Sequence, residues 1–192
     1  MSLFEMYLKL GFQHIINING YDHIVFVLAL CAGYSIKELK KVLILVTAFT
    51  IGHSLTLALS TLKIISIPSD IIEFLIPATI LVTALSNVLP FKSRNNRFIY
   101  IVTLFFGLIH GLGFSNYLKE LLGREANIIT PLLAFNIGLE LGQIVILIAY
   151  FLLLLLTVNV FKARDNFWRI FISGIAVGIA MILLMDTGKV LF

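Results

Sequence analysis

Long apolar runs separated by short polar segments dominate the chain. They cover residues 21–34, 42–61, 70–90, 98–117, 129–157 and 167–188. Runs of about 20 residues match the hydrocarbon thickness of a bilayer, where only helices or closed barrels satisfy all of their backbone hydrogen bonds. The runs are continuous and not alternating, which favours helices. We therefore predict an all-α, polytopic membrane protein, a compact bundle of six transmembrane helices forming one integral membrane domain over residues 1–192.

The first run is short for a full crossing. Residues 3–18, which precede it, are apolar with scattered polar positions, and Gly20 with its two neighbouring asparagines, Asn17 and Asn19, provides a joint. This segment could extend the first span, lie in the membrane interface as a short helix, or fold back as a re-entrant helix.

Composition supports placement in a lipid bilayer. The 192 residues are 60% hydrophobic and 12% charged, with a mean hydropathy of +1.06, which is too apolar for a water-soluble fold of this size. The net charge of +4 does not indicate a nucleic-acid partner, because the basic residues gather in the connections between spans. Their positions indicate orientation instead.

Basic residues divide unequally between the two sets of connections. The richer set follows the first, third and fifth runs and contains Lys37, Lys40, Lys41, Lys92, Arg94, Arg97, Lys162, Arg164 and Arg169. The poorer set contains Lys9, Lys63, Lys119, Arg124 and Lys189. Cytoplasmic loops retain Lys and Arg, so the alternation predicts six spans with both termini on the extracytoplasmic side.

All four histidines occur in small polar islands within the apolar sequence. His14 and His23 bracket the joint, His53 precedes Ser54, and His110 is followed by a glycine. At about 1.5 Å per helical residue, the predicted orientation places these histidines and nearby acids in the outer half of the bilayer, on five of the six spans. Ionisable groups at such depths are functional candidates by default.

Imidazole and carboxylate groups together suit borderline divalent cations such as nickel, cobalt and zinc. A cation would also offset the cost of burying a carboxylate in the membrane. The predicted ligands are His14, Asp22, His23, His53, His110 and Glu140. They suffice for one ion with four to six ligands or for two neighbouring ions. Taken singly, a membrane histidine could equally bridge two helices, and an aspartate could cap one.

Further polar residues are expected around these ligands. They are Ser54, Glu73, Asn136 and Gln143, of which Ser54 and Gln143 would orient a histidine or Glu140. Glycine pairs spaced four residues apart predict close helix contacts. The pairs are Gly107 and Gly111, Gly138 and Gly142, and Gly174 and Gly178. Such faces could pack within one bundle or between protomers, so the sequence also allows a homo-oligomer.

Several of these motifs resemble one family. They are Gly20-Tyr-Asp22-His23, Phe49-Thr-Ile-Gly-His53-Ser54, Gly107-Leu-Ile-His110-Gly111 and Asn136-Ile-Gly138-Leu-Glu140. Together they are similar to the HupE/UreJ family of small bacterial membrane proteins, over nearly the whole chain. That family is associated with hydrogenase and urease operons and with nickel or cobalt uptake. The resemblance implies metal-ion permeation through a six-helix bundle in the bacterial cytoplasmic (inner) membrane.

One motif also resembles the His-x4-Asp-His signature of nickel/cobalt permeases, although seven residues separate His14 from Asp22 here. Because the resemblance points to transport, we favour a transporter or facilitator for a divalent transition metal. In such a transporter, the outer capture site would consist of His14, Asp22 and His23. The mid-membrane site would consist of His53, His110 and Glu140.

Two other functions stay open. One is an intramembrane, metal-dependent hydrolase that acts on a lipid or a lipid-linked substrate, with Glu140 or Glu73 as general base. The other is a metal-binding accessory protein without turnover.

Overall fold

Helices account for 89% of the computed structural model, and the residues it describes contain no strand. These residues are 2–89, 96–122, 128–160, 162 and 164–191. Residue 90 of the predicted third span and the loop residues Lys92, Arg94 and Arg124 lie outside them. The elements are α1 (Leu3–Ile16), η1 (Ile18–Gly20), α2 (Asp22–Ala32), η2 (Ile36–Glu38), α3 (Leu39–Thr61), α4 (Ser69–Val88), α5 (Asn96–Gly113), α6 (Ser115–Leu122), α7 (Ile129–Asn159) and α8 (Asp165–Leu191).

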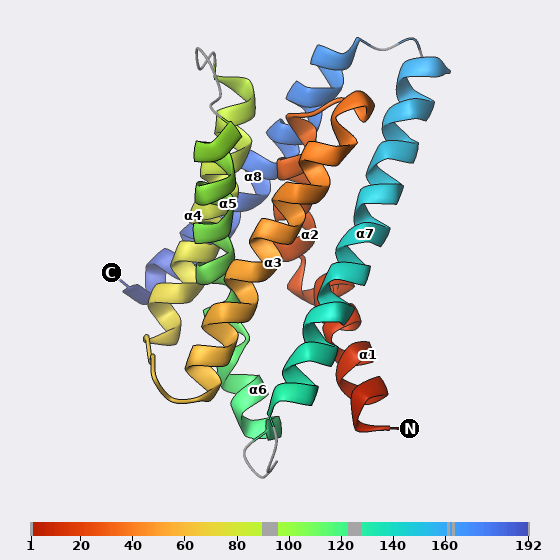
Figure 1. Ribbon diagram of the computed structural model, residues 1–192. Helices are drawn as coiled ribbons and strands as arrows, with labels where there is room; N and C mark the ends of the chain where they lie inside the picture. Colours follow the sequence, from red (N-terminus) through yellow and green to blue (C-terminus); the bar gives the residue numbers. More distant parts are fainter. Residues whose placement is uncertain (1, 90–95, 123–127, 161, 163, 192) are drawn as a thin grey trace.

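Five segments are long and apolar enough to cross a membrane. They are Ile36–Thr61, Ser69–Val88, Asn96–Gly113, Ile129–Val158 and Asn166–Val190. The prediction of an all-α, multi-pass membrane protein is therefore confirmed. In Figure 1, α3, α5 and α8 begin at one end of the bundle and run towards the end that carries α6. We call these two ends the basic end and the α6 end.

Two short helices in succession stand in place of a long first span. α2 has only 11 residues, about 17 Å of helix, and α1 adds 14 residues before it. Figure 1 shows α1 and α2 following one another from the α6 end towards the basic end. At the joint, the Asn17 side chain accepts a hydrogen bond from the backbone N–H of Asn19 at 3.0 Å, which stabilises the turn between the helices. α1 thus continues the course of α2 along the bundle, and its placement in the membrane stays a prediction.

α5 ends earlier than the apolar run that predicted it. The run continued to residue 117, but α5 stops at Gly113 and the short helix α6 follows. The Ser115 hydroxyl donates to the carbonyl oxygen of Leu112 at 2.8 Å and satisfies one of the free carbonyls at this helix end. Leu118 and Leu122 of α6 are buried, so the apolar character of this segment reflects packing and not membrane crossing.

Two glycine pairs allow helix backbones to touch. A Cβ atom at Gly107 would lie 2.1 Å from the carbonyl oxygen of Phe49, and one at Gly138 would lie 2.1 Å from that of Leu8. These distances are far below van der Waals contact, so only glycine fits where α5 packs on α3 and where α7 packs on α1.

The third glycine pair faces away from the bundle. A Cβ atom at Gly174 or Gly178 would meet nothing within 4 Å among the described residues. α8 instead packs through its small residues Ala176 and Ala180, both buried in a cluster with Ile80 and Ala84 of α4. The closely packed face of α8 is therefore its alanine face.

Candidate metal centre

The four histidines converge from four different helices. His14 lies in the last turn of α1, His23 in the first turn of α2, His53 within α3 and His110 in the last turn of α5. The ring centroid of His23 lies 4.6 Å from that of His14, 5.9 Å from that of His53 and 5.1 Å from that of His110. His53 and His110 are fully buried, and His23 is nearly so. The α1–α2 joint and the glycine contact between α3 and α5 bring these helices together.

The ligand atoms form two groups of three that share His23. In one group, atoms of His14, His23 and His53 lie within 4.8 Å of one another, and in the other, atoms of Asp22, His23 and His110 do so. Nitrogen ligands about 2.1 Å from a common ion are themselves about 3 to 4 Å apart. A small side-chain movement would therefore bring either group to ligand distance.

Buried ring nitrogens without hydrogen-bond partners show that the residues fit a metal. Within the described residues these atoms are Nε2 of His14, Nε2 of His23, both ring nitrogens of His53 and Nδ1 of His110. Buried polar atoms in proteins are almost always paired, because an unpaired one costs about 1 to 3 kcal/mol. A neutral imidazole has one ring-nitrogen lone pair, so the four histidines together offer up to four lone pairs, which suit a cation.

A threonine on α4 orients His110. The Thr79 hydroxyl donates its proton to the Ile76 carbonyl oxygen at 2.7 Å and lies 2.8 Å from Nε2 of His110. Because the hydroxyl has only one proton, we assign the proton of neutral His110 to Nε2, which donates to Thr79. The lone pair of Nδ1 then faces the cluster, as expected when a hydrogen-bonded partner orients a metal ligand.

Asp22 provides the carboxylate of the cluster. Its Oδ2 lies 3.3 Å from Nδ1 of His23. It also lies in the first turn of α2, where the free N–H groups of the helix favour negative charge. Asp22 lines a cavity of about 460 Å³ together with Glu73 of α4 and Thr187 of α8, which we call the Asp22 cavity.

A second cavity reaches the cluster from another side. It has a volume of about 630 Å³ and is lined by His14, Gln13 and Asn17, with Phe114 and Tyr117 beyond α5. We call it the His14 cavity. Each of the two cavities therefore has a ligand residue in its wall.

Phenylalanine rings surround the histidines on their remaining sides. Phe114 lies 4.0 Å from His14 between ring centroids and stacks on Phe135 at 5.1 Å, while Phe26 and Phe49 lie 5.0 and 5.1 Å from His110. These rings shield the ligands from lipid and narrow the space for an ion. Sequence reasoning missed their role and that of Thr79, because phenylalanine and threonine are ordinary residues of membrane helices.

Glu140 lies outside both three-ligand groups. Its Oε1 accepts a hydrogen bond from the Thr47 hydroxyl at 3.0 Å, and the neighbouring Gln143 accepts one from the Thr50 hydroxyl at 2.7 Å. Both threonines belong to α3 and precede His53. Glu140 and Gln143 therefore contact α3 in the turns that precede His53.

The other predicted neighbours of the ligands have different surroundings. Ser54 donates to the Thr50 carbonyl oxygen of its own helix at 2.6 Å. Asn136 has a buried Oδ1 without a hydrogen-bond partner in the described part of the chain. Glu73 is exposed and shares the Asp22 cavity.

These features define a class: a helical, multi-pass membrane protein with a buried histidine and aspartate cluster of the kind that binds transition metals. Residues 1–187 match the family described as HupE / UreJ protein, so the chain belongs to the HupE/UreJ family. Searches of curated proteins and of solved structures returned no match. The family is associated with nickel and cobalt transport or uptake.

Proposed function

We propose that the protein is a transporter or facilitator for a divalent transition metal of the nickel, cobalt or zinc type. The metal is its substrate, and His14, Asp22, His23, His53 and His110 bind it. The proposal is carried by the four histidines, each with an unpartnered buried ring nitrogen, which form two overlapping three-ligand groups together with Asp22.

Access to the cluster is from the α6 end. The Asp22 cavity is lined by Glu73 near the start of α4 and by Thr187 near the end of α8, and both positions lie towards that end. Two carboxylates in one cavity attract a cation before it reaches the imidazoles. We assign the α6 end to the extracytoplasmic side of the bacterial cytoplasmic (inner) membrane, because the basic end carries the richer set of Lys and Arg.

The onward route follows the contact between α3 and α7. Gln143 with Thr50, and Glu140 with Thr47, provide oxygen ligands beside the turns of α3 that precede His53. Oxygen ligands bind borderline cations more weakly than imidazoles do. Permeation requires sites that bind an ion and also release it, and Glu140 provides such a weaker site.

The alternative is a metal-dependent hydrolase acting on a lipid or lipid-linked substrate. It is favoured by the position of Glu73, an exposed carboxylate in the same cavity as Asp22, where it could serve as general base towards a metal-bound water.

Metal flux into sealed proteoliposomes that contain a metal-sensitive dye distinguishes these functions. The transporter predicts flux with the native chain, none with the His23→Ala variant, and unchanged flux with the control variant Lys63→Ala in an exposed turn. A native chain that binds nickel, passes none of it across the membrane and loses lipid hydrolysis on Glu73→Gln substitution would establish the hydrolase instead.

A further inference from the structure

A third cavity lies at the basic end, away from the metal centre. It has a volume of about 660 Å³ and is bounded by the end of α7, the start of α8 and the turn that joins α2 to η2. Its lining residues include Lys37, Leu154, Leu155, Val158, Trp168 and Arg169. We call it the Trp168 cleft. Its volume is in the range of ligand-binding pockets.

The cleft exists because α7 and α8 pack against different partners. α7 packs mainly on α1, and α8 packs mainly on α4, so these consecutive helices have only a slight direct contact within the described residues. Figure 1 shows the end of α7 apart from the start of α8, with the turn after α2 beside them. A hydrogen bond spans the gap, because the Trp168 Nε1–H group donates to the Tyr150 hydroxyl at 3.1 Å.

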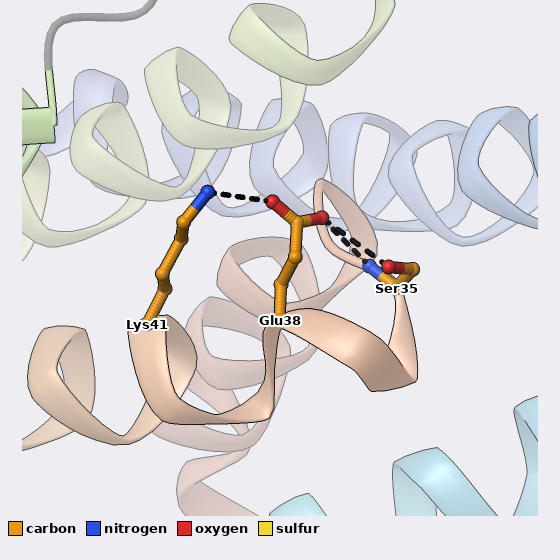
Figure 2. Close-up of polar contacts among 3 residues, drawn as sticks. All are labelled: Ser35, Glu38 and Lys41. Atoms are coloured by element: carbon orange, nitrogen blue, oxygen red, sulfur yellow. Dashed lines mark hydrogen bonds and ion pairs between the residues drawn. The ribbon is translucent and has the colours of Figure 1, made fainter.

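The rim of the cleft is positively charged. Lys37 and Arg169 are exposed and line it, and Arg169 donates a hydrogen bond to the neutral amide oxygen of Asn166. The acid on the same rim, Glu38, is already engaged. Its carboxylate accepts a hydrogen bond from Lys41 at 2.9 Å and two from the backbone N–H and hydroxyl of Ser35 at 3.3 Å, as Figure 2 shows.

We propose that the Trp168 cleft binds a phospholipid with an anionic head group from the leaflet at the basic end. An acyl chain would lie along Leu154, Leu155 and Val158, and the lipid phosphate would lie between Lys37 and Arg169. An apolar wall with two cations at its rim matches an amphiphile with a negative head, and basic pockets between helices are the usual sites for such lipids. Trp168, near the start of α8, lines the cleft and is an aromatic residue of the kind that contacts lipid head groups. The lipid fills the gap that the packing of α7 and α8 leaves.

The test is native mass spectrometry of the full chain released from vesicles of equal parts phosphatidylglycerol and phosphatidylcholine. The native chain is expected to retain phosphatidylglycerol in preference. Each of the variants Lys37→Gln and Arg169→Gln should reduce its retention roughly 5-fold, and the double variant roughly 30-fold. Lys40→Gln is the matched control, because it removes the same charge from the same end of the bundle but does not line the cleft.

A further variant tests the apolar wall. Leu155→Trp keeps every charge and fills the cleft, so it should also reduce retention, with helicity measured by circular dichroism to verify folding. An equal loss with Lys40→Gln would overturn the proposal in favour of general surface attraction. Equal retention of phosphatidylcholine, or displacement of the lipid by millimolar inorganic phosphate, would overturn it as well.

Discussion

His23 contributes to both three-ligand groups, whereas each of the other ligands contributes to one. Its position in the first turn of α2, beside Asp22 and between His14 and His110, makes it the geometric centre of the cluster. The loss of its imidazole removes a ligand from either possible arrangement of the ion.

We expect His23→Ala to weaken nickel binding more than His14→Ala does, because a chain without His14 still contains the group formed by Asp22, His23 and His110. Isothermal titration calorimetry in detergent would measure both affinities. The His23 effect should exceed the roughly 10- to 100-fold loss typical for a residue that only orients a ligand. Equal effects of the two variants would contradict a shared role for His23.

The contact between Thr79 and His110 leads to a second prediction for a single residue. Thr79→Val keeps the shape of the side chain but removes the oxygen that accepts the His110 Nε2–H bond, so nickel affinity should fall about 10- to 100-fold. Thr79→Ser should restore it. Thr83→Val on the same helix is the control, because the Thr83 hydroxyl bonds only to the Thr79 carbonyl oxygen in the described structure. Failure of the serine variant to rescue binding would show that Thr79 acts through packing alone.

The histidines could be recognised from sequence because they are rare polar residues in apolar spans on one side of the predicted topology. Thr79 could not, since its role depends on α4 facing α5, which no local pattern encodes. Glu140 shows a second limit. Its depth along α7 resembles that of the histidines, but the direction of its side chain, towards Thr47, is set by how α7 rotates against α3.

At the scale of helices, close backbone contacts at glycine residues hold neighbouring helices together. We expect Gly107→Ala to destabilise the protein by about 1 to 3 kcal/mol, because the added methyl group would overlap the Phe49 carbonyl oxygen. Thermal unfolding in detergent would show this as a lower melting temperature.

The matched control is Gly174→Ala, whose methyl group would meet nothing in the described structure. It should be neutral or stabilising by up to about 1 kcal/mol, because alanine is the better helix former. Destabilisation by Gly174→Ala equal to that of Gly107→Ala would contradict the contacts described for α5 and α8.

Six apolar runs and their connections were predictable because burial in lipid requires long uninterrupted helices. The short α2 was recognisable as too short, but its completion by α1 depended on tertiary contact with α7. The end of α5 at Gly113 and the outward direction of Gly174 were not predictable either. The spacing of small residues indicates that a helix can pack closely. Whether it does so depends on which neighbouring helix faces those residues.

At the scale of the whole molecule, orientation can be tested by thiol labelling of intact cells. In a chain with Cys31→Ala, a thiol introduced by Lys63→Cys, in the exposed turn between α3 and α4, should react with an impermeant maleimide from outside. A thiol introduced by Lys37→Cys should react only after permeabilisation if the basic end faces the cytoplasm, as we propose. The reverse pattern would place the metal centre nearer the cytoplasmic surface.

The proposed route along α3 and α7 makes Glu140 a transport residue and not part of the binding cluster. Glu140→Gln should slow nickel flux into proteoliposomes at least about 10-fold, since an amide binds the cation more weakly than a carboxylate does. Equilibrium affinity at the cluster should stay unchanged. Glu120→Gln, an exposed acid on α6, is the control. Unchanged flux with Glu140→Gln would exclude the route along α3 and α7.

The joint between α1 and α2 has a consequence for how this centre can vary among related chains. Each residue added to or removed from a helix rotates all later side chains by about 100° about the helix axis. Residues 17–21 form a turn between the two helices, so a change of length there need not rotate the side chains within either helix. Insertions or deletions tolerated there would reset the angle between His14 and the Asp22-His23 pair without disturbing either helix. Chains with shorter or longer joints could thereby present the same three side chains to ions of different size.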